Sequence, residues 1–343
     1  MNNKEGNCMQ SINRPELVRE HNLEILRRAL FLSRRATRQQ LSEQTGISTV
    51  TLGALLTDLI QSGEAYEADT ESSGTGRPFH VYCYNGDYRF GLSLRIQQEI
   101  PDIYLYVKIL NRYGKVYFEE KRPFLHLDYQ GTRSCLLELL KPYHPIGSVV
   151  IGLPGIGFQR YFREEADCQY LSLEALRELE HEIGIPILLE NDINLAALGY
   201  QQKQGFPTEK TMAYFFLMKG RHAGSAIYAN GKIHQGKERF AGEVPNDLYG
   251  VDWTILNTED DEEICTALLK LIPFYVSILA PHRIVIASNY ITSAHLQYVR
   301  ERLAAMLGQY CCPEFELTED FTSDYENGVR QTLLEQIKVE VEW

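Results

Sequence analysis

The stretch from Arg34 to Gly63 constrains the fold most, because it predicts two short helices joined by a tight turn. Thr37 and Gln40 have the spacing of a capping box, so a helix is expected to begin directly after Thr37 and to end near Gly46. Ser48 can cap a second helix, whose leucines fall at the i, i+3, i+4 and i+7 positions of one apolar stripe: Leu52, Leu55, Leu56 and Leu59. This pattern predicts a helix-turn-helix, with an ordinary helical hairpin as the alternative.

In a DNA-binding helix-turn-helix, the outer face of the second helix enters the major groove. Here that face offers small polar and apolar side chains: Ser48, Thr49, Val50, Thr51 and Ala54. Such side chains can contact thymine methyls and form single hydrogen bonds, but they carry no charge, and no Lys or Arg occurs from residue 39 to residue 76. Phosphate contacts are therefore expected from arginines outside this helix: Arg27, Arg28, Arg34, Arg35, Arg38 and Arg77.

The flanking residues extend this unit on both sides. A helix over residues 14–31 is expected to support the other two. A Gly/Ser-rich turn over residues 72–76 separates two strand-like runs, which predicts a β-hairpin like the wing of a winged helix. Arg77 at its tip either reaches a minor groove or phosphate, or is a solvated loop arginine. We therefore predict a winged helix-turn-helix DNA-binding domain over residues 1–87.

Composition limits the remaining possibilities. A chain of 343 residues can hold two or three domains, and a net charge of −12 disfavours a protein that coats nucleic acid over its whole surface. Seven scattered cysteines without a Cys-x-x-Cys pair indicate free thiols in a reducing compartment. No apolar run is long enough for a membrane span, and the N-terminus lacks an apolar signal core, so a cytoplasmic protein without a membrane partner is expected.

From residue 88 onward, strand and helix patterns alternate, which is typical of an α/β architecture with helices covering a sheet. Strands are expected at residues 88–94, 103–110, 115–121, 148–153, 186–190 and 283–287, and a β-hairpin within 212–233 that turns at Asn230-Gly231. Helices are expected at residues 134–141, 173–183, 193–204, 262–279 and 293–307.

Two motifs follow the winged helix in order, ENDINLAALGY at residues 190–200 and NGKIHQGKERFAGE at residues 230–243. Together they resemble the ROK family, named for its repressors, open reading frames and kinases, and the resemblance runs over nearly the whole chain. It implies a two-lobed, actin-like ATPase fold built on ribonuclease-H-like sheets, with a sugar between the lobes. The ROK domain would span residues 88–343, with lobe one at about 88–190 plus the C-terminal helix and lobe two at about 191–322.

Family members with an N-terminal winged helix resemble xylose and N-acetylglucosamine repressors, whereas members without it are mostly sugar kinases. Three departures separate this chain from the kinases, because glycines that would let backbone N–H groups approach the phosphates of ATP are missing. They concern residues 91–96, 220–224 and 288–290. The resemblance therefore implies no ATP cofactor, no catalytic residue and no kinase activity.

The family's zinc site is also absent, since Asn246 stands in the place of its histidine and no cysteine occurs between Asn246 and Cys265. We expect no metal. By resemblance, Asn191 and Asp192 would bind sugar hydroxyls, with Asp192 matching the catalytic base of the kinases, and Glu243 would lie near the anomeric end. The alternative role for Asp192 is to cap the helix that begins at Ile193.

These residues predict a transcriptional regulator of carbohydrate metabolism, acting as a repressor that binds an operator in double-stranded DNA as a homodimer or a dimer of dimers. A neutral or acylated sugar bound by Asn191, Asp192, Glu243 and Asn246 would act as effector. Two alternatives stay open: a sugar kinase with an appended DNA-binding domain, and a regulator whose ROK domain binds a protein partner instead of a sugar.

Overall fold

The computed structural model describes residues 14–71, 79–99, 102–123, 129–141, 145–153, 173–318 and 320–337. The chain divides into two compact units, the first ending at Arg89 and the second beginning at Phe90. No helix among the described residues is long and apolar enough to cross a membrane.

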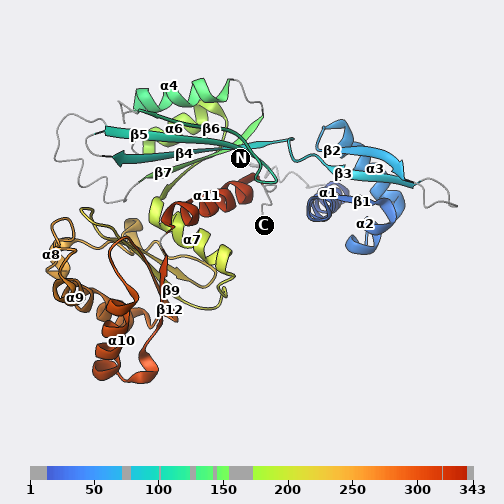
Figure 1. Cartoon of the computed structure of the whole chain (residues 1–343). Helices are drawn as coiled ribbons and strands as arrows, with labels where there is room; N and C mark the ends of the chain where they lie inside the picture. Colours follow the sequence, from blue (N-terminus) through green and yellow to red (C-terminus); the bar gives the residue numbers. More distant parts are fainter. Residues whose placement is uncertain are drawn as a thin grey trace, which may run out of the picture. The chain divides into compact units, whose positions relative to one another are not determined.

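The first unit combines helices with a small antiparallel sheet whose strand order is β1-β3-β2 (Figure 1). Its described elements are α1 (Arg14–Ser33), β1 (Arg35–Thr37), α2 (Arg38–Thr45), α3 (Thr49–Gln61), β2 (Ala65–Glu71) and β3 (Phe79–Tyr84). The helix predicted over residues 14–31 and the predicted β-hairpin are confirmed. Strand β1 was not predicted, because three residues are too few to show an alternating pattern. The turn over residues 72–78, including Arg77, lies outside the described residues.

Leucines fill the core of this unit. The predicted stripe of α3 is buried, and Leu26 and Leu30 of α1 and Leu41 of α2 have no exposed surface. At about 1.5 to 3 kcal/mol for each fully buried side chain, these leucines hold the three helices together against the conformational entropy of ordering them.

The second unit contains two five-stranded sheets, the first in the order β6-β5-β4-β7-β8. Its strands are β4 (Phe90–Glu99), β5 (Asp102–Asn111), β6 (Val116–Pro123), β7 (Ile146–Leu153) and β8 (Ile187–Asn191). Strands β4, β5 and β6 are antiparallel, whereas β7 and β8 run parallel to β4. Helices α4 (Tyr129–Leu140) and α6 (Leu173–Ile183) pack against one face of this sheet through a common apolar core.

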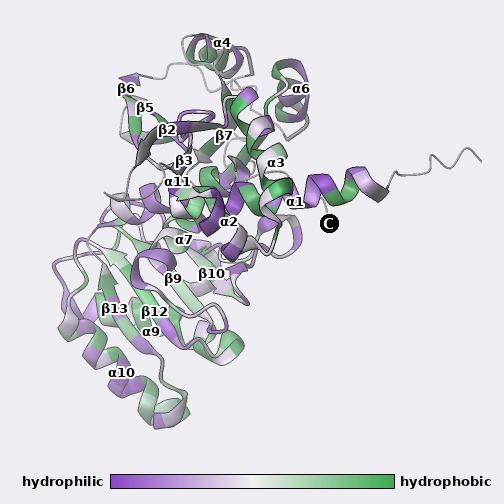
Figure 2. Ribbon diagram, turned by 90° about the vertical axis from the view of Figure 1, so that its right-hand side faces the viewer, coloured by the Kyte–Doolittle hydropathy of each residue, from purple (hydrophilic) through white to green (hydrophobic). Residues whose placement is uncertain are grey.

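The second sheet has the order β11-β10-β9-β12-β13. Its strands are β9 (Met212–Leu217), β10 (Gly224–Ala229), β11 (Lys232–Ile233), β12 (Arg283–Ser288) and β13 (Glu314–Thr318). The predicted turn at Asn230-Gly231 is confirmed, with both residues at positive φ. Helices α8 (Asn246–Tyr249), α9 (Asp261–Leu279) and α10 (Ser293–Leu307) follow the hairpin, and α9 and α10 share a core with this sheet, whose central strands are strongly hydrophobic (Figure 2).

Helices α7 (Asp192–Gln204) and α11 (Phe321–Ile337) pack against each other and share one apolar cluster with residues of both sheets (Figure 1). The two helix backbones are nearly in contact. A Cβ added to Gly199 would lie 1.9 Å from the carbonyl oxygen of Asp324, and one added to Gly328 would lie 1.8 Å from that of Leu195. Only glycine permits this crossing.

Most of the predicted elements of this unit are confirmed, with shifted ends. Strand β4 extends to Glu99 instead of ending at residue 94, because β5 continues to pair with it as far as Asp102. Helix α4 begins at Tyr129, five residues before the predicted start. Strand β13 was not predicted, since its Glu-Phe-Glu-Leu-Thr sequence has only two large apolar residues.

Candidate functional site

The first candidate site is the outer face of α3. The capping box predicted for α2 is confirmed: Thr37 Oγ1 accepts from the Gln40 backbone N–H at 3.2 Å, and the Gln40 side chain accepts from the Thr37 N–H at 2.8 Å. Gly46 ends α2 in the left-handed conformation, with φ of 72°. Ser48 then caps α3 by accepting from the Thr51 N–H at 3.2 Å, as predicted.

The turn leaves the N-terminal end of α3 exposed. Val50 is 84% exposed, although it is apolar, and a group of small side chains around it is also exposed: Ser48, Thr49, Thr51, Ala54 and Thr57. The Ser48 and Thr51 hydroxyls lie 2.9 Å apart and form one polar pair at the helix start. This surface, uncharged and with one projecting apolar side chain, has the chemistry of a groove-reading helix that contacts thymine methyls.

The predicted phosphate-contacting arginines have different surroundings. Arg38 donates to the Tyr82 hydroxyl at 2.8 Å, and its guanidinium lies beside Gly53 of α3, so it is held next to the candidate recognition helix while remaining exposed. Arg34 and Arg35 are also exposed. Arg27 instead donates to the buried carboxylate of Glu64 at 2.8 Å, an ion pair that joins α1 to the strand region. The charge of Arg27 therefore neutralises a carboxylate that is only 2% exposed, which gives this arginine a role inside the unit.

The second candidate site lies where β8 ends and α7 begins. Asn191 caps α7, since its Oδ1 accepts from the N–H groups of Ile193 at 2.7 Å and Asn194 at 3.2 Å. The alternative that Asp192 is the cap is wrong: Asp192 is the first residue of the helix, where the helix dipole favours its negative charge. Asn191 Oδ1 therefore accepts its hydrogen bonds from the helix backbone, and the residue is buried.

Glu190 connects the two family motifs. Its Oε1 accepts from the Asn194 side chain at 2.9 Å, and its Oε2 accepts from the Gln235 side chain at 2.8 Å. Arg239 adds a hydrogen bond of 2.7 Å to the Leu189 carbonyl. Residues 234–243 are therefore tied to the end of β8, which brings the segments carrying Asp192 and Glu243 together. Sequence reasoning missed Gln235 and Arg239, although both belong to the second motif.

Glu243 ends the Ala-Gly-Glu sequence in a constrained backbone. Gly242 has φ of 95°, and an added Cβ would lie 2.4 Å from the Ser225 carbonyl oxygen, so glycine is required there. Asn246 starts α8 and donates to Asp252 at 2.9 Å, while its own buried Oδ1 has no hydrogen-bond partner among the described residues. Hydrogen bonds from Thr254 lower the pKa of Asp252. Among the described residues, no group of three or more His, Cys, Asp or Glu is placed to hold a metal ion.

The resemblance predicts that three segments replace the phosphate loops of the kinases. Residues 91–96 lie inside β4. In the two loops after β9 and β12, side chains already accept from backbone N–H groups: Asn289 Oδ1 from Lys219 at 3.2 Å, and Ser288 Oγ from Tyr290 at 3.2 Å and Ile291 at 3.1 Å. These N–H groups are not available to a phosphate.

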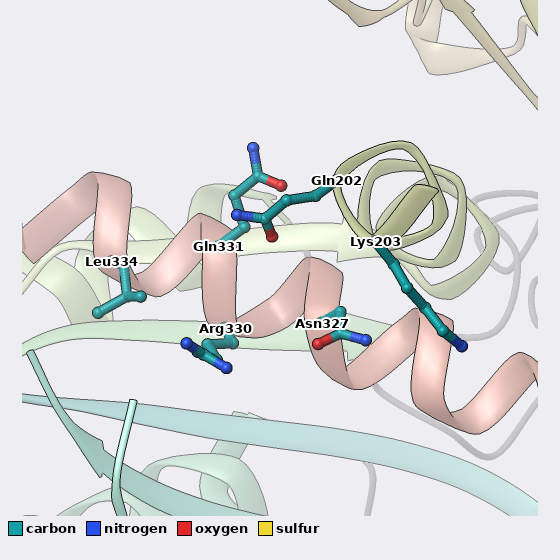
Figure 3. Close-up of a pocket in the computed structure, with 6 residues that line it drawn as sticks. All are labelled: Gln202, Lys203, Asn327, Arg330, Gln331 and Leu334. Carbon is teal, nitrogen blue, oxygen red and sulfur yellow. The ribbon is translucent and has the colours of Figure 1, made fainter. Parts of the chain in front are cut away.

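A small cavity of about 200 Å³ lies between α7 and α11, lined by Gln202, Lys203, Asn327, Arg330, Gln331 and Leu334 (Figure 3). It is at the C-terminal end of α7. Since a helix rises about 1.5 Å per residue, Lys203 lies roughly 16 Å along the axis from Asp192. The cavity is therefore separate from the candidate sugar site.

Two five-stranded sheets with two helices packed between them, following a compact helical unit, define an α/β protein of the ROK type. Residues 133–246 match the model of the ROK family, and the chain contains a ROK family domain. The chain is similar to the xylose repressor of Bacillus subtilis (strain 168), with 20% identity over 238 residues. The match covers 66% of this chain and 60% of the repressor's length.

Other relatives include kinases. A segment of 67 residues is 39% identical to a glucokinase of Halalkalibacterium halodurans. This match covers 20% of this chain and 20% of the glucokinase. Among solved structures, a ROK family transcriptional regulator homologous to the E. coli MLC protein superposes with a TM-score of 0.57 at 17% identity, covering 94% of this chain and 98% of that chain. A ROK hexokinase from Thermus thermophilus superposes with a TM-score of 0.53 at 14% identity, covering 73% and 99%. These similarities show that the chain shares a fold with both regulators and kinases.

Proposed function

We propose that this protein is a DNA-binding transcriptional repressor of carbohydrate metabolism, with a winged helix-turn-helix at residues 1–87 and a sugar-sensing ROK domain at residues 88–343. The observation that carries the proposal is the capped α2–α3 pair, whose second helix buries four leucines and exposes an uncharged N-terminal face. Val50, which is 84% exposed, lies on this face among small polar side chains, where its methyl groups could contact a thymine methyl.

Affinity for DNA then depends on arginines near this face, chiefly Arg34, Arg35 and Arg38. A dimer, or a dimer of dimers, would present two such helices to a pseudo-palindromic operator. The sugar would bind at the carboxyl end of β8 through Asp192 and Glu243, and it would alter DNA affinity by its different affinity for two arrangements of the ROK domain.

The proposal excludes kinase activity. The observation in its favour is that Ser288 and Asn289 accept from three backbone N–H groups in the two loops, those of Lys219, Tyr290 and Ile291, which leaves fewer donors for a phosphate. Asp192 could act as a base toward a sugar hydroxyl, but phosphoryl transfer also requires groups that bind the γ-phosphate.

The test is selection of binding sites from random double-stranded DNA by the whole chain, followed by titration of the selected site with V50E. This variant places a negative charge on the exposed face, so we expect affinity to fall at least about tenfold through repulsion from phosphate and loss of the apolar contact. The matched control is I278E, the same kind of change at a residue that is 77% exposed on α9. Enrichment of no sequence, or equal affinity of V50E and I278E, would refute the assignment of α3.

A further inference from the structure

Helix α1 has one face in the core of the first unit and an opposite face directed at solvent. Leu26 and Leu30 lie in the core and have no exposed surface. With 3.6 residues per turn, the side chains on the opposite side of the helix form one stripe: Leu17, His21, Glu24, Arg28 and Leu32. Of the two leucines at its ends, Leu17 is 48% exposed and Leu32 is 70% exposed. We call this stripe the outer α1 face.

Charges along this side of α1 are divided between its two halves. Glu20 and Glu24 lie in the N-terminal half and Arg28 lies in the C-terminal half. Among the described residues, none of these three side chains forms an ion pair or a hydrogen bond. Arg19, in contrast, lies on another side of the helix and pairs with Asp58 of α3. The outer α1 face is therefore acidic toward one end and basic toward the other, with a leucine at each end.

This pattern is complementary to itself when two copies of α1 lie antiparallel. A twofold axis beside Glu24 brings Leu17 opposite Leu32 of the other copy, so that leucines pack together at both ends. Since a helix rises about 1.5 Å per residue, Arg28 then lies within about 5 Å, measured along the axis, of Glu20 and Glu24 of the other copy. In a parallel pair, Arg28 would face Arg28 and Glu24 would face Glu24, which like-charge repulsion disfavours.

Pairing through this face leaves the candidate recognition helix free. The pair of Arg19 with Asp58 places α3 on the other side of α1, and Val50 of α3 stays exposed. The outer α1 face is small beside a standard interface, which takes about 20 to 30 residues from each partner. We therefore expect it to act most strongly between chains that DNA already holds together, where the effective concentration is high.

We propose that the outer α1 face joins the DNA-binding units of two copies of this chain in an antiparallel helix pair. This rests on the proposed function, in which a dimer binds two half-sites, and adds the surface through which the two DNA-binding units contact each other. The charge pattern selects a second copy as the occupant, because Glu20 and Glu24 would repel a DNA phosphate beside Arg28 but attract the Arg28 of another chain.

Cysteine cross-linking of the whole chain tests the contact without DNA. In an antiparallel pair with helix axes about 8 to 10 Å apart, the two copies of residue 24 lie beside the twofold axis, close enough for a disulfide. On oxidation, E24C should form at least about threefold more covalent dimer than the wild type, because pairing raises the local concentration of the two thiols. E43C, the same change at an exposed glutamate of α2, is the matched control and should stay at the wild-type background.

Exchange of the charges identifies the occupant of the face, at about 0.15 M salt, where charges more than about 8 Å apart are screened. R28E should lower affinity for DNA with two half-sites about tenfold but leave affinity for a single half-site unchanged, since like charges then meet between the copies. E20R/E24R should do the same, although its added positive charge would strengthen binding if the face contacted phosphate. The combined variant R28E/E20R/E24R should recover wild-type affinity, because opposite charges face each other again. R300E, at an exposed arginine of α10, is the matched control and should bind both DNAs as the wild type does.

The remaining outcomes would overturn the proposal. E24C dimer no more abundant than that of E43C, or unchanged affinity of R28E for two half-sites, would show that two copies do not meet at this face. Equal weakening of both DNAs by R28E would assign Arg28 to a phosphate. Weakening by both charge variants without recovery in the combined variant would assign the face to another occupant. If no DNA sequence is enriched, the proposed function is refuted, whereas the E24C cross-link still decides whether the outer α1 faces pair.

Discussion

The crossing of α7 and α11 yields the most direct prediction about stability. An alanine Cβ at position 199 or 328 would lie within 2 Å of a backbone carbonyl oxygen of the opposite helix, and the ordinary contact distance is about 3.4 Å or more. The helix axes would have to separate by roughly 1.5 Å, because a backbone oxygen cannot rotate away as a side chain can.

Overpacking costs about 1 to 3 kcal/mol, and a rigid backbone clash belongs at the upper end of that range. Replacing glycine by alanine within a helix returns about 1 kcal/mol. We therefore expect G199A and G328A each to lower the free energy of unfolding by about 2 kcal/mol. The double variant should lose less than the sum, since one separation of the helices relieves both clashes.

Urea unfolding measures these changes, with circular dichroism for the helices and the fluorescence of buried Trp253 for the second unit. G53A is the control: the nearest atom to its Cβ would be a guanidinium nitrogen of Arg38 at 3.4 Å, so no backbone clash arises and a small gain of stability is expected. Unfolding free energies of G199A and G328A equal to that of the wild type would refute the argument that the two helix backbones determine the packing.

Three further predictions concern charge and chemistry. R34A and R38A should each reduce the log–log salt slope of operator binding by about 1, and unchanged slopes would remove these two arginines from the interface. R27A should lower stability by about 1 to 3 kcal/mol, because it removes the ion pair from the buried Glu64 carboxylate. Burial raises the pKa of Asp324, despite hydrogen bonds from Tyr214 and Thr318, so the folded state favours its protonated form. Its contribution to stability is therefore lost as pH rises through the folded pKa. In urea titrations, the wild type should gain stability relative to D324N as the pH falls toward the folded pKa, and parallel curves would contradict this. The wild type should release no more ADP from ATP in the presence of sugar than the control variant D192A does. Greater release by the wild type would support the alternative of a sugar kinase.

Local patterns predicted the fold well where a few neighbouring residues determine the structure. Thr37 with Gln40, Ser48 before the leucine stripe, and Asn230-Gly231 are self-contained signals, and each forms the predicted cap or turn. Strand β1 was missed because its three residues are held by pairing with β3, about 45 positions further along the chain. That pairing leaves no local pattern.

The candidate site was harder to predict, because its residues meet only in the folded chain. Two acceptors stand side by side at the start of α7, and the sequence does not distinguish Asn191 from Asp192 as the cap. The sequence predicts Glu190 only as the end of a strand, whereas in the structure its carboxylate joins the two motifs by accepting from Gln235. Arg95 interrupts the apolar part of β4, and its contacts with the rings of Tyr106, Phe321 and Tyr325 form only in the folded chain.

The central claim is that this chain binds a specific DNA site and that a sugar ligand weakens the binding. Fluorescence anisotropy with the selected DNA site, at one fixed salt concentration, measures the dissociation constant with and without a saturating concentration of a sugar that calorimetry has shown to bind. We expect the ligand to weaken DNA binding by about 5- to 150-fold, the range of typical couplings of about 1 to 3 kcal/mol, and we expect D192A to abolish the effect. Equal dissociation constants with and without the bound sugar would contradict the account.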